Sequence, residues 1–479
     1  MGDFENVAAA RRESIWVGTE PERPVLPRLE RDVEADVAVI GGGIVGLTTA
    51  LLAQDAGARV VLIEADRVGH GVSGYTTAKV SSQHGLIYAR LKSSLGPDAA
   101  RLYGQINEAA LAWIAERVEV DGIDCDFRRR ESYAYVVSES EWDRVEAEAR
   151  AATAAGLPVS LVEDTPLPYP VAAAVRFDDQ AEFHAGKYLY ALTELLLAGG
   201  CDIYEHSRAV GVDEGGRCVV ETDAGGRLFA DRVVVATHYP FLDRSLAFAR
   251  VHTERSYAIA CRVSGDLPDG MFISGDSPTR SIRTAPVGDD DELLLVGGES
   301  HRTGTGGDTE ERYRNLERFA RQHWDVESIE YRWSSQDGIT LDGVPYVGRI
   351  TPRSRRILAA TGFAKWGMTG GTAAAAVLAE LLESDARSPA AELLDPWRLT
   401  VRASLPTLIQ ENAKVGMHLL GDQVAKRHSP RCTHLGCKLA WNSGERSWDC
   451  PCHGSRFAAD GSVLEGPAVT PLDLDYSAD

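Results

Sequence analysis

A glycine-rich turn between two short apolar runs constrains the fold of this chain more than any other feature. The order along the chain is an apolar run at 36–40, the turn Gly-Gly-Gly-Ile-Val-Gly at 41–46, a helical pattern to residue 54, and a second apolar run at 59–64. In such a βαβ unit Gly41 allows the tight turn, Gly43 lets the backbone approach a pyrophosphate, and Gly46 lets the helix lie close to the sheet. The helix N-terminus offers free N–H groups to the anion, and Glu64 can accept hydrogen bonds from ribose hydroxyls. The sequence therefore predicts a dinucleotide site.

The segments that follow indicate which dinucleotide this site holds. After Glu64 the chain runs through a polar, glycine-rich stretch, residues 66–79, which is too irregular for the next helix of an NAD-binding domain. It resembles the segment that runs beneath FAD in the D-amino acid oxidase and glycine oxidase flavoproteins. Residues 231–238 resemble the strand that re-enters the FAD domain of that family, although His238 replaces a glycine, and residues 342–371 resemble its closing flavin segment. The resemblance implies an α/β fold, with a Rossmann-like FAD-binding domain interleaved with an α+β substrate domain.

Eight segments are expected along the chain. They are an N-terminal arm (1–31), three FAD-binding segments (32–90, 176–246 and 334–384), two parts of a substrate domain (91–175 and 247–333), a connector with a helix (385–428) and a small all-β C-terminal domain (429–479). Hydrophobic periodicity predicts helices at 99–114, 187–198 and 405–420, and strands at 132–137, 256–263, 271–274 and 292–297. We expect the arm to lie on the surface, with Trp16 as its contact with the core.

The same resemblance implies which residues meet the cofactor and the substrate. The expected FAD-binding residues are Gly41, Gly43, Gly46, Glu64, Thr76, Thr77, Ala78, Lys79, Gly362, Gly367, Met368 and Thr369. Lys365 and Trp366 are the candidate catalytic residues, since Lys365 can polarise the flavin or assist oxygen; the alternative is that it only extends into solvent. His84 and His238 are weaker candidates, because a lone histidine is more often structural. Noncovalent FAD is expected, because Tyr75-Thr-Thr stands where some relatives carry the attached histidine.

A cysteine and histidine constellation marks the C-terminal domain. Its two motifs, Cys432-x-His434 and Cys450-x-x-His453, are separated by fifteen residues. Two thiolates and two imidazoles form the ligand set of a Rieske [2Fe–2S] centre, and zinc is the alternative because Cys and His also suit a tetrahedral site. An extra cysteine inside each motif, the Gly-Ser after the second histidine and the Gly-Pro-Ala at 466–468 favour the iron–sulfur cluster.

This segment closely resembles the high-potential Rieske domains of the cytochrome bc type. The resemblance implies that Cys432, His434, Cys450 and His453 hold the cluster and that Cys437 is bonded to Cys452. Ser455 matches a hydroxyl that raises the potential, whereas Phe457 stands where those proteins carry a tyrosine, so we expect an intermediate potential within roughly −150 to +300 mV.

Few residues precede the first motif, so this Rieske domain looks shortened. A segment of this length forms only a small core, which ordinarily needs additional stabilisation by disulfides, a metal centre or contacts with another surface. We therefore expect it to dock on the flavoprotein body, and we do not expect it to fold alone.

Composition and charge exclude several classes of partner. The formal net charge of −21 argues against nucleic acid or an anionic membrane surface, because either partner would favour a basic face. No apolar run reaches the length of about 18 residues that a membrane segment needs, and no signal core follows the N-terminus. A cytoplasmic location is expected, in which the scattered Cys125, Cys201, Cys218 and Cys261 are inert core residues.

FAD together with a Rieske domain suggests oxidation of an amine or amino acid, with electrons leaving through the cluster or to oxygen. A carboxylate on the substrate would require an arginine, and Arg255, Arg262 and Arg302 are the candidates. One alternative is a reductase that supplies a partner oxygenase. It would need a second nucleotide-binding unit, and the glycine-rich Thr303–Asp308 segment is expected to lack the flanking strand and helix. A non-catalytic redox carrier is the other alternative. A Rieske oxygenase is disfavoured, since no additional iron-binding motif is visible.

Overall fold

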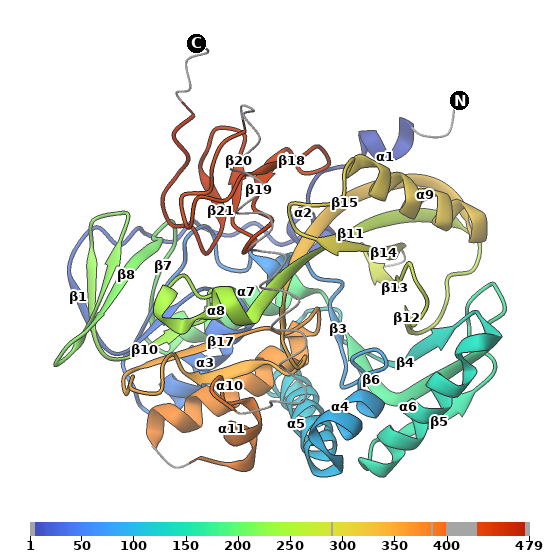
Figure 1. Ribbon diagram of the computed structural model, residues 1–479, viewed down its shortest axis with the longest axis horizontal. Helices are drawn as coiled ribbons and strands as arrows, with labels where there is room; N and C mark the ends of the chain where they lie inside the picture. Colours follow the sequence, from blue (N-terminus) through green and yellow to red (C-terminus); the bar gives the residue numbers. More distant parts are fainter. Residues whose placement is uncertain (1–4, 289–290, 385–386, 399–428, 475–479) are drawn as a thin grey trace.

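The computed structural model describes residues 5–288, 291–384, 387–398 and 429–474. These residues form two large sheets with helices around them and a small third sheet near the C-terminus (Figure 1). The mixed α/β architecture and the small all-β C-terminal sheet confirm the expected fold class. The expected helix at 405–420 lies outside the described residues.

The first sheet carries the glycine-rich turn. It has eight strands in the order β16-β17-β10-β1-β2-β7, and β9 pairs with both β10 and β8. The strands are β1 (Val33–Ile40), β2 (Val60–Ile63), β7 (Asp202–Tyr204), β8 (Ala209–Glu214), β9 (Cys218–Thr222), β10 (Arg227–Val235), β16 (Tyr346–Arg349) and β17 (Ile357–Thr361). Its central strands are parallel, and every residue of β2 is buried, as expected for a parallel strand covered on both faces.

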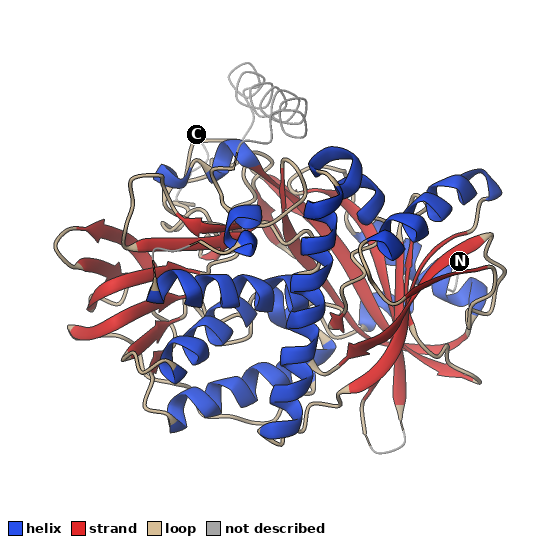
Figure 2. Ribbon diagram, turned by 90° about the horizontal axis from the view of Figure 1, so that it is seen from below, coloured by secondary structure: helices blue, strands red, loops and turns tan. Residues whose placement is uncertain are grey.

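Helices cover this sheet and support the turn. They include α3 (Ile44–Asp55), α7 (Ala185–Ala198), α10 (Gly367–Glu383), α5 (Pro97–Val120) and α4 (Tyr88–Leu95). Helix α3 packs against both α7 and α10, and α10 also packs against α5. Figure 2 shows the strands in two groups, with helices in front of and between them. The strand, turn, helix and strand expected between residues 36 and 64 are therefore confirmed.

The second sheet is the larger one. It has nine strands in the order β15-β11-β14-β13-β12-β4-β6-β3, with β5 paired to β6. The strands are β3 (Lys79–Val80), β4 (Arg128–Val136), β5 (Val159–Val162), β6 (Ala173–Glu182), β11 (Val251–Ser264), β12 (Met271–Ser274), β13 (Arg280–Pro286), β14 (Glu292–Arg302) and β15 (Asp325–Thr340). Helices α6 (Trp142–Ala154) and α9 (Glu310–His323) pack against it. The expected boundaries at 175/176 and 333/334 fall inside β6 and β15, because these strands continue their pairing within this sheet.

The N-terminal arm is anchored more firmly than a surface arm would be. It contains the short helices α1 (Glu5–Ala9) and α2 (Ile15–Gly18), and Arg11 forms an isolated bridge with Tyr331 of β15. Trp16 is fully buried, and its indole N–H donates to the carbonyl of Thr76 at 2.6 Å. The expected contact of Trp16 with the core is confirmed, and the surface position expected for the whole arm is wrong, because these contacts bury its middle.

The C-terminal segment forms a four-stranded antiparallel sheet, β18-β19-β20-β21. Its strands are β18 (Ala440–Asn442), β19 (Ser447–Asp449), β20 (Arg456–Ala458) and β21 (Val463–Glu465). Figure 1 shows this segment, in red, seated above the junction of the first sheet with the long strands β11 and β15. No helix among the described residues is long and apolar enough to cross a membrane.

Candidate active site and candidate metal centre

The glycine-rich turn is closed by backbone contacts that leave no room for side chains. Gly41 has a φ of +112°, and a Cβ there would lie 2.5 Å from the carbonyl oxygen of Ala236. A Cβ on Gly46 would lie 1.8 Å from the carbonyl oxygen of Gly41. Gly43 caps helix α3, where a Cβ would enter the space beside the hydroxyl of Ser73, at 3.0 Å. The turn thus keeps an open cradle at a helix N-terminus, which fits a pyrophosphate.

Glu64 fastens the turn to the end of β2. Its carboxylate accepts hydrogen bonds from the N–H groups of Gly42 at 2.7 Å and Asp66 at 2.9 Å. Burial raises the pKa of Glu64, and these two N–H groups oppose that effect. The side chain also lines the cavity beside the turn, which is where a ribose-binding acid must lie.

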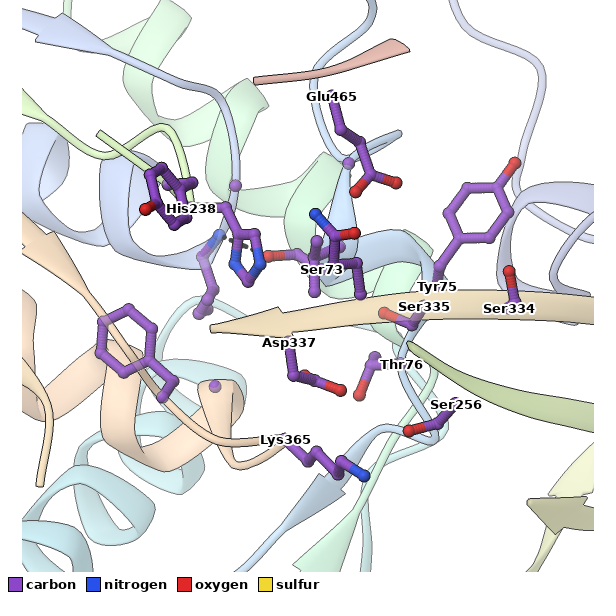
Figure 3. Close-up of a pocket in the computed structure, with 18 of the residues that line it drawn as sticks. Ser73, Tyr75, Thr76, His238, Ser256, Ser334, Ser335, Asp337, Lys365 and Glu465 are labelled. Atoms are coloured by element: carbon purple, nitrogen blue, oxygen red, sulfur yellow. Dashed lines mark hydrogen bonds between the residues drawn. The ribbon is translucent and has the colours of Figure 1, made fainter. Parts of the chain in front are cut away.

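A cavity of about 750 Å³ extends from the turn to the face of the second sheet (Figure 3). Most of the expected cofactor and catalytic residues line it: Gly41, Gly43, Glu64, Thr76, Thr77, Lys79, Lys365, Trp366, Gly367 and Met368. Segments that are far apart in the sequence therefore meet around one space, and this space fits the dinucleotide that the turn implies.

Four of the expected cofactor residues support the wall of this cavity but do not line it. Gly46 and Gly362 allow close backbone approach, and a Cβ on Gly362 would lie 2.2 Å from the side chain of Thr340. The carbonyl of Ala78 accepts a hydrogen bond from the buried Arg283 at 2.8 Å. The Thr369 hydroxyl donates to the carbonyl of Ser81 at 2.7 Å.

Lys79 has a buried amine at the edge of the cavity. Its ammonium group donates to the carbonyl of Phe272 at 2.7 Å and is hydrogen-bonded to Ser281. Burial and the neighbouring Arg283 together lower the pKa of Lys79 to about 7, although Glu182 acts in the opposite direction. Lys79 therefore links the segment beneath the cavity to the second sheet.

Lys365 and Trp366 both line the cavity, in different ways. Lys365 has a φ of +78°, and its ammonium group is hydrogen-bonded to the hydroxyl of Ser300 and lies 3.6 Å from the carboxylate of Glu254. The residue is exposed, and its ammonium group is paired with side chains of the second sheet. Trp366 stacks on the ring of His84, with ring centroids 5.0 Å apart. Burial lowers the pKa of His84 to about 3, so this ring is neutral and acts as a support.

The four expected cluster ligands come together in the C-terminal segment. Cys432 and Cys450 are buried and unbridged, and Cys437 and Cys452 form a disulfide, as the resemblance implied. The rings of His434 and His453 are nearly perpendicular, with centroids 5.3 Å apart.

The donor atoms of these residues fit an iron–sulfur centre. Among the described residues, the Nδ1 atoms of both histidines are buried without a hydrogen-bond partner. Cys432 and Cys450 are hydrogen-bonded to each other, which lowers the pKa of the Cys432 thiol and raises that of Cys450, so the two sulfur atoms lie side by side. Ser455 is hydrogen-bonded to Cys432 and accepts from the N–H of Ala468 at 3.0 Å. Two thiol groups and two unsatisfied imidazole nitrogens are the ligand set of a Rieske [2Fe–2S] cluster.

Comparison with known proteins agrees with both sites. The family model for FAD dependent oxidoreductases (DAO) matches residues 36–381, and the model for the Rieske [2Fe-2S] domain matches residues 413–474. The chain belongs to the FAD dependent oxidoreductase family. FAD and a Rieske [2Fe–2S] cluster are accordingly its cofactors.

Three similar proteins cover most of this oxidoreductase. A putative Rieske 2Fe-2S iron-sulfur protein, YhfW, of Bacillus subtilis (strain 168) is 36% identical over 509 residues, which cover 98% of this chain and 99% of that protein. Gamma-glutamylputrescine oxidoreductase of Escherichia coli (strain K12) is 25% identical over 372 residues, or 75% of this chain and 86% of that protein. Glycine oxidase from Geobacillus kaustophilus has the same fold, with a TM-score of 0.63 at 21% identity, covering 76% of this chain and 99% of that one.

The Rieske segment of the oxidoreductase docks on the flavoprotein body through its ligand loops. The Nε2 atom of His434 lies 2.7 Å from the carboxylate of Asp243, and the ring of His453 meets Phe248 edge to face at 5.9 Å. The side-chain amide of Gln336 donates to the carbonyl of Gly454 at 2.9 Å. The expected docking is therefore present in the structure.

The glycine-rich segment after Arg302 forms part of this docking surface. Strand β14 precedes this segment and helix α9 follows it, so the expectation that it lacks a flanking strand and helix is wrong. The strand belongs to an antiparallel pairing, however, and a Cβ on Gly304 would lie 2.5 Å from the backbone nitrogen of Pro451. Gly304 thus accommodates a Rieske loop, which accounts for one of the three glycines of this segment.

The three candidate arginines for a carboxylate are engaged elsewhere. Arg255 is fully buried and bonds to Ser334 at 2.7 Å and to Glu465 of the Rieske segment at 3.2 Å. Arg262 forms ion pairs at the surface, and Arg302 donates to the carbonyl of Pro451 at 3.3 Å. The two arginines of the Rieske interface thus serve docking.

Several residues of the site were not singled out in the sequence. Asp337 and Ser335 line the cavity from β15, and Tyr239 lines it from the loop after β10. The sequence does carry one signal for these residues. Trp333, Ser335 and Asp337 alternate along one strand, and every second side chain of a strand points to the same face, so the three are expected to share a face. A boundary placed at 333/334 divided that strand.

Proposed function

We propose that this oxidoreductase oxidises an amine or an amino acid in the cavity and passes the electrons on through its Rieske domain. The observation that carries the proposal is that Glu465, Gly466 and Ala468 of the Rieske segment line the same cavity as the glycine-rich turn. The names of the similar amine and amino acid oxidising flavoproteins support the substrate class.

The cofactor-binding turn, the cluster ligands and the second sheet have different roles in this proposal. When bound, FAD supplies a two-electron acceptor and the [2Fe–2S] cluster a one-electron carrier. The turn at Gly41 and the carboxylate of Glu64 position the dinucleotide, and Cys432, His434, Cys450 and His453 hold the cluster. The second sheet covers the cavity and orients the substrate, which is the main requirement of hydride transfer once the substrate amine has lost its ammonium proton.

The docking geometry supports transfer inside one chain. The imidazole edges of His434 and His453 face Asp243 and Phe248 of the body. Tyr239 is buried, lines the cavity, and lies close enough to Cys450 for the two groups to interact electrostatically. Tyr239 therefore connects the cavity with the ligand Cys450 and offers electrons a route inside the protein.

Anaerobic stopped-flow mixing with a panel of amines and amino acids tests the proposal. We expect a substrate to bleach the flavin and then to produce the electron paramagnetic resonance signal of the reduced cluster, whereas NADH and NADPH reduce neither at a catalytic rate. Rapid reduction by a nicotinamide nucleotide would favour the reductase alternative. Flavin reduction with an unreduced cluster would assign the electrons to oxygen, and zinc in place of iron would remove the cluster from the mechanism.

A further inference from the structure

Asp337 carries a buried carboxylate that no other residue neutralises directly. The residue is 7% exposed and lies on β15, where its backbone is paired with Glu254 of β11. Figure 3 shows the carboxylate among Thr76, Ser256 and Lys365, on the wall of the cavity. Within the described parts of the chain, burial and nearby charges act on this carboxylate, and no hydrogen-bond donor does.

The charges that face Asp337 are already matched to other groups. Lys365 is hydrogen-bonded to Ser300 and paired with Glu254 at 3.6 Å. Arg255 is bonded to Glu465 at 3.2 Å. Burial raises the pKa of Asp337 to about 6; Lys365 and Arg255 lower it, and Glu254 and Glu465 raise it. A carboxylate left in such surroundings costs free energy unless a cation joins it.

Apart from Lys365, the wall beside this carboxylate carries small hydroxyl side chains. Ser256 and Ser300 are hydrogen-bonded to each other at 3.1 Å, and Ser335 precedes Asp337 on the same face of β15. Small hydroxyl groups leave room for a ligand and can accept hydrogen bonds from its N–H groups. Arg255, Arg262 and Arg302 do not line the cavity. Of the arginines that do, Arg12 and Arg208 donate to backbone carbonyls of the Rieske segment, Arg456 is bonded to Asp449 within that segment, and Arg144 donates to the carbonyl of Gly275.

We propose that Asp337 binds the ammonium group of the substrate, so that the cavity selects cationic amines over amino acids that present a carboxylate there. This inference rests on the proposed function and names the substrate class of that same site. The serine hydroxyls around Asp337 complete the recognition of the N–H groups.

The test compares two probes that differ by one carboxylate, butylamine and norvaline, on the FAD-loaded full chain. The Asp337→Asn variant keeps the size of the side chain and removes its charge. Glu254→Gln is the matched control, because it removes a carboxylate beside Lys365 that does not line the cavity. The dissociation constant is taken from the change in flavin absorbance, and the reduction rate at saturation from anaerobic stopped flow.

We expect the wild type to bind butylamine more tightly than norvaline. Asp337→Asn should weaken butylamine binding about 10- to 100-fold, as expected for loss of a charged hydrogen bond, while the FAD content stays that of the wild type. Glu254→Gln should change binding less than about threefold. In the wild type, butylamine binding should weaken as the pH falls through about 6, where Asp337 becomes protonated. Binding by Asp337→Asn should not show this pH dependence.

Four outcomes would overturn the inference. Equal butylamine binding by the wild type and Asp337→Asn would show that the carboxylate does not meet the amine. Loss of FAD from Asp337→Asn would assign the carboxylate to the cofactor. Preference for norvaline that is insensitive to Asp337→Asn would leave the proposed function standing and remove only this inference, whereas failure of every amine and amino acid to reduce the flavin would remove both.

Discussion

The flavoprotein body and the Rieske segment are stabilised in different ways. The body has a continuous hydrophobic core that joins strands of both large sheets with the helices that cover them. The core of the Rieske segment consists of Cys432, Cys437, Leu439, Cys450, Cys452, Phe457, Ala468 and Leu472, so half of it is cysteine. Its four strands have three residues each. We therefore expect the body to support its own site, and the Rieske segment to depend on its disulfide, its cluster and its docking surface.

The two sites differ accordingly. The dinucleotide site is built largely from backbone, because the glycines of the turn and the N-terminus of α3 are fixed by local geometry. The cluster site needs side chains of the body as well, since Asp243, Gln336 and Phe248 contact its two ligand loops. A domain can be short when another part of the same chain supplies some of the side chains that surround its site.

Separating the two regions should have the largest effect. We expect a peptide covering residues 429–479 to remain unfolded and to hold no cluster, because its small core lacks the docking contacts with the flavoprotein body. Far-ultraviolet circular dichroism and electron paramagnetic resonance after iron–sulfur reconstitution measure this. A chain that ends at residue 398 is the control, and it should still fold and bind FAD. A cluster signal from the peptide alone would show that the Rieske segment is self-sufficient.

Two arginines on strand β11 distinguish buried docking from surface pairing. Arg255→Leu should destabilise the docked Rieske segment by about 3 to 5 kcal/mol, since it leaves Glu465 and Asp449 with one cationic partner fewer. Arg262→Leu should cost about 0 to 1 kcal/mol, because its ion pairs are exposed. Urea unfolding and limited proteolysis of the C-terminal segment provide the measurement. Similar losses in both variants would contradict the distinction.

Glu64→Ala should weaken FAD binding while the body remains folded. The variant removes the acceptor for two backbone N–H groups and for the ribose, so the dissociation constant should rise about 10- to 100-fold. Asp36→Ala is the control, because Asp36 makes a similar bond to the N–H of Arg59 at the other end of the strands. Acid precipitation of the wild type should leave the yellow colour in the supernatant. A coloured pellet would mean that the flavin is covalent.

The last variant has an effect of the opposite sign. Asp337→Asn should stabilise the protein free of FAD, because the pKa of Asp337 is raised from the ordinary 3.8 to about 6 and ionisation therefore costs stability. The gain should grow as the pH rises from about 4 through 6 and reach about 3 kcal/mol at most above that range. Scanning calorimetry at pH 4.5 and 7.5 measures it. Equal melting temperatures at the higher pH would show that the carboxylate is satisfied in the folded protein.

The sequence allowed most of the fold and the cofactor ligands to be predicted. Glycine, cysteine and histidine carry signals of local geometry, so the turn at Gly41 and the motifs at Cys432 and Cys450 could be recognised without knowledge of distant contacts. Strands such as β12 were found at their observed bounds, because alternation is also local. The individual cofactor and catalytic roles, including that of Lys365, remain predictions, as do the intermediate potential and the effect of Phe457.

Only the tertiary structure shows the roles of the charged residues. Arg255 and Arg262 lie seven positions apart on one strand, yet one is fully buried against the Rieske segment and the other lies at the surface. Asp337 became a candidate only when β15 was seen to face the cavity. The pKa and the pairing of a charge depend on burial and on groups far away in the sequence, and no local pattern records either of them.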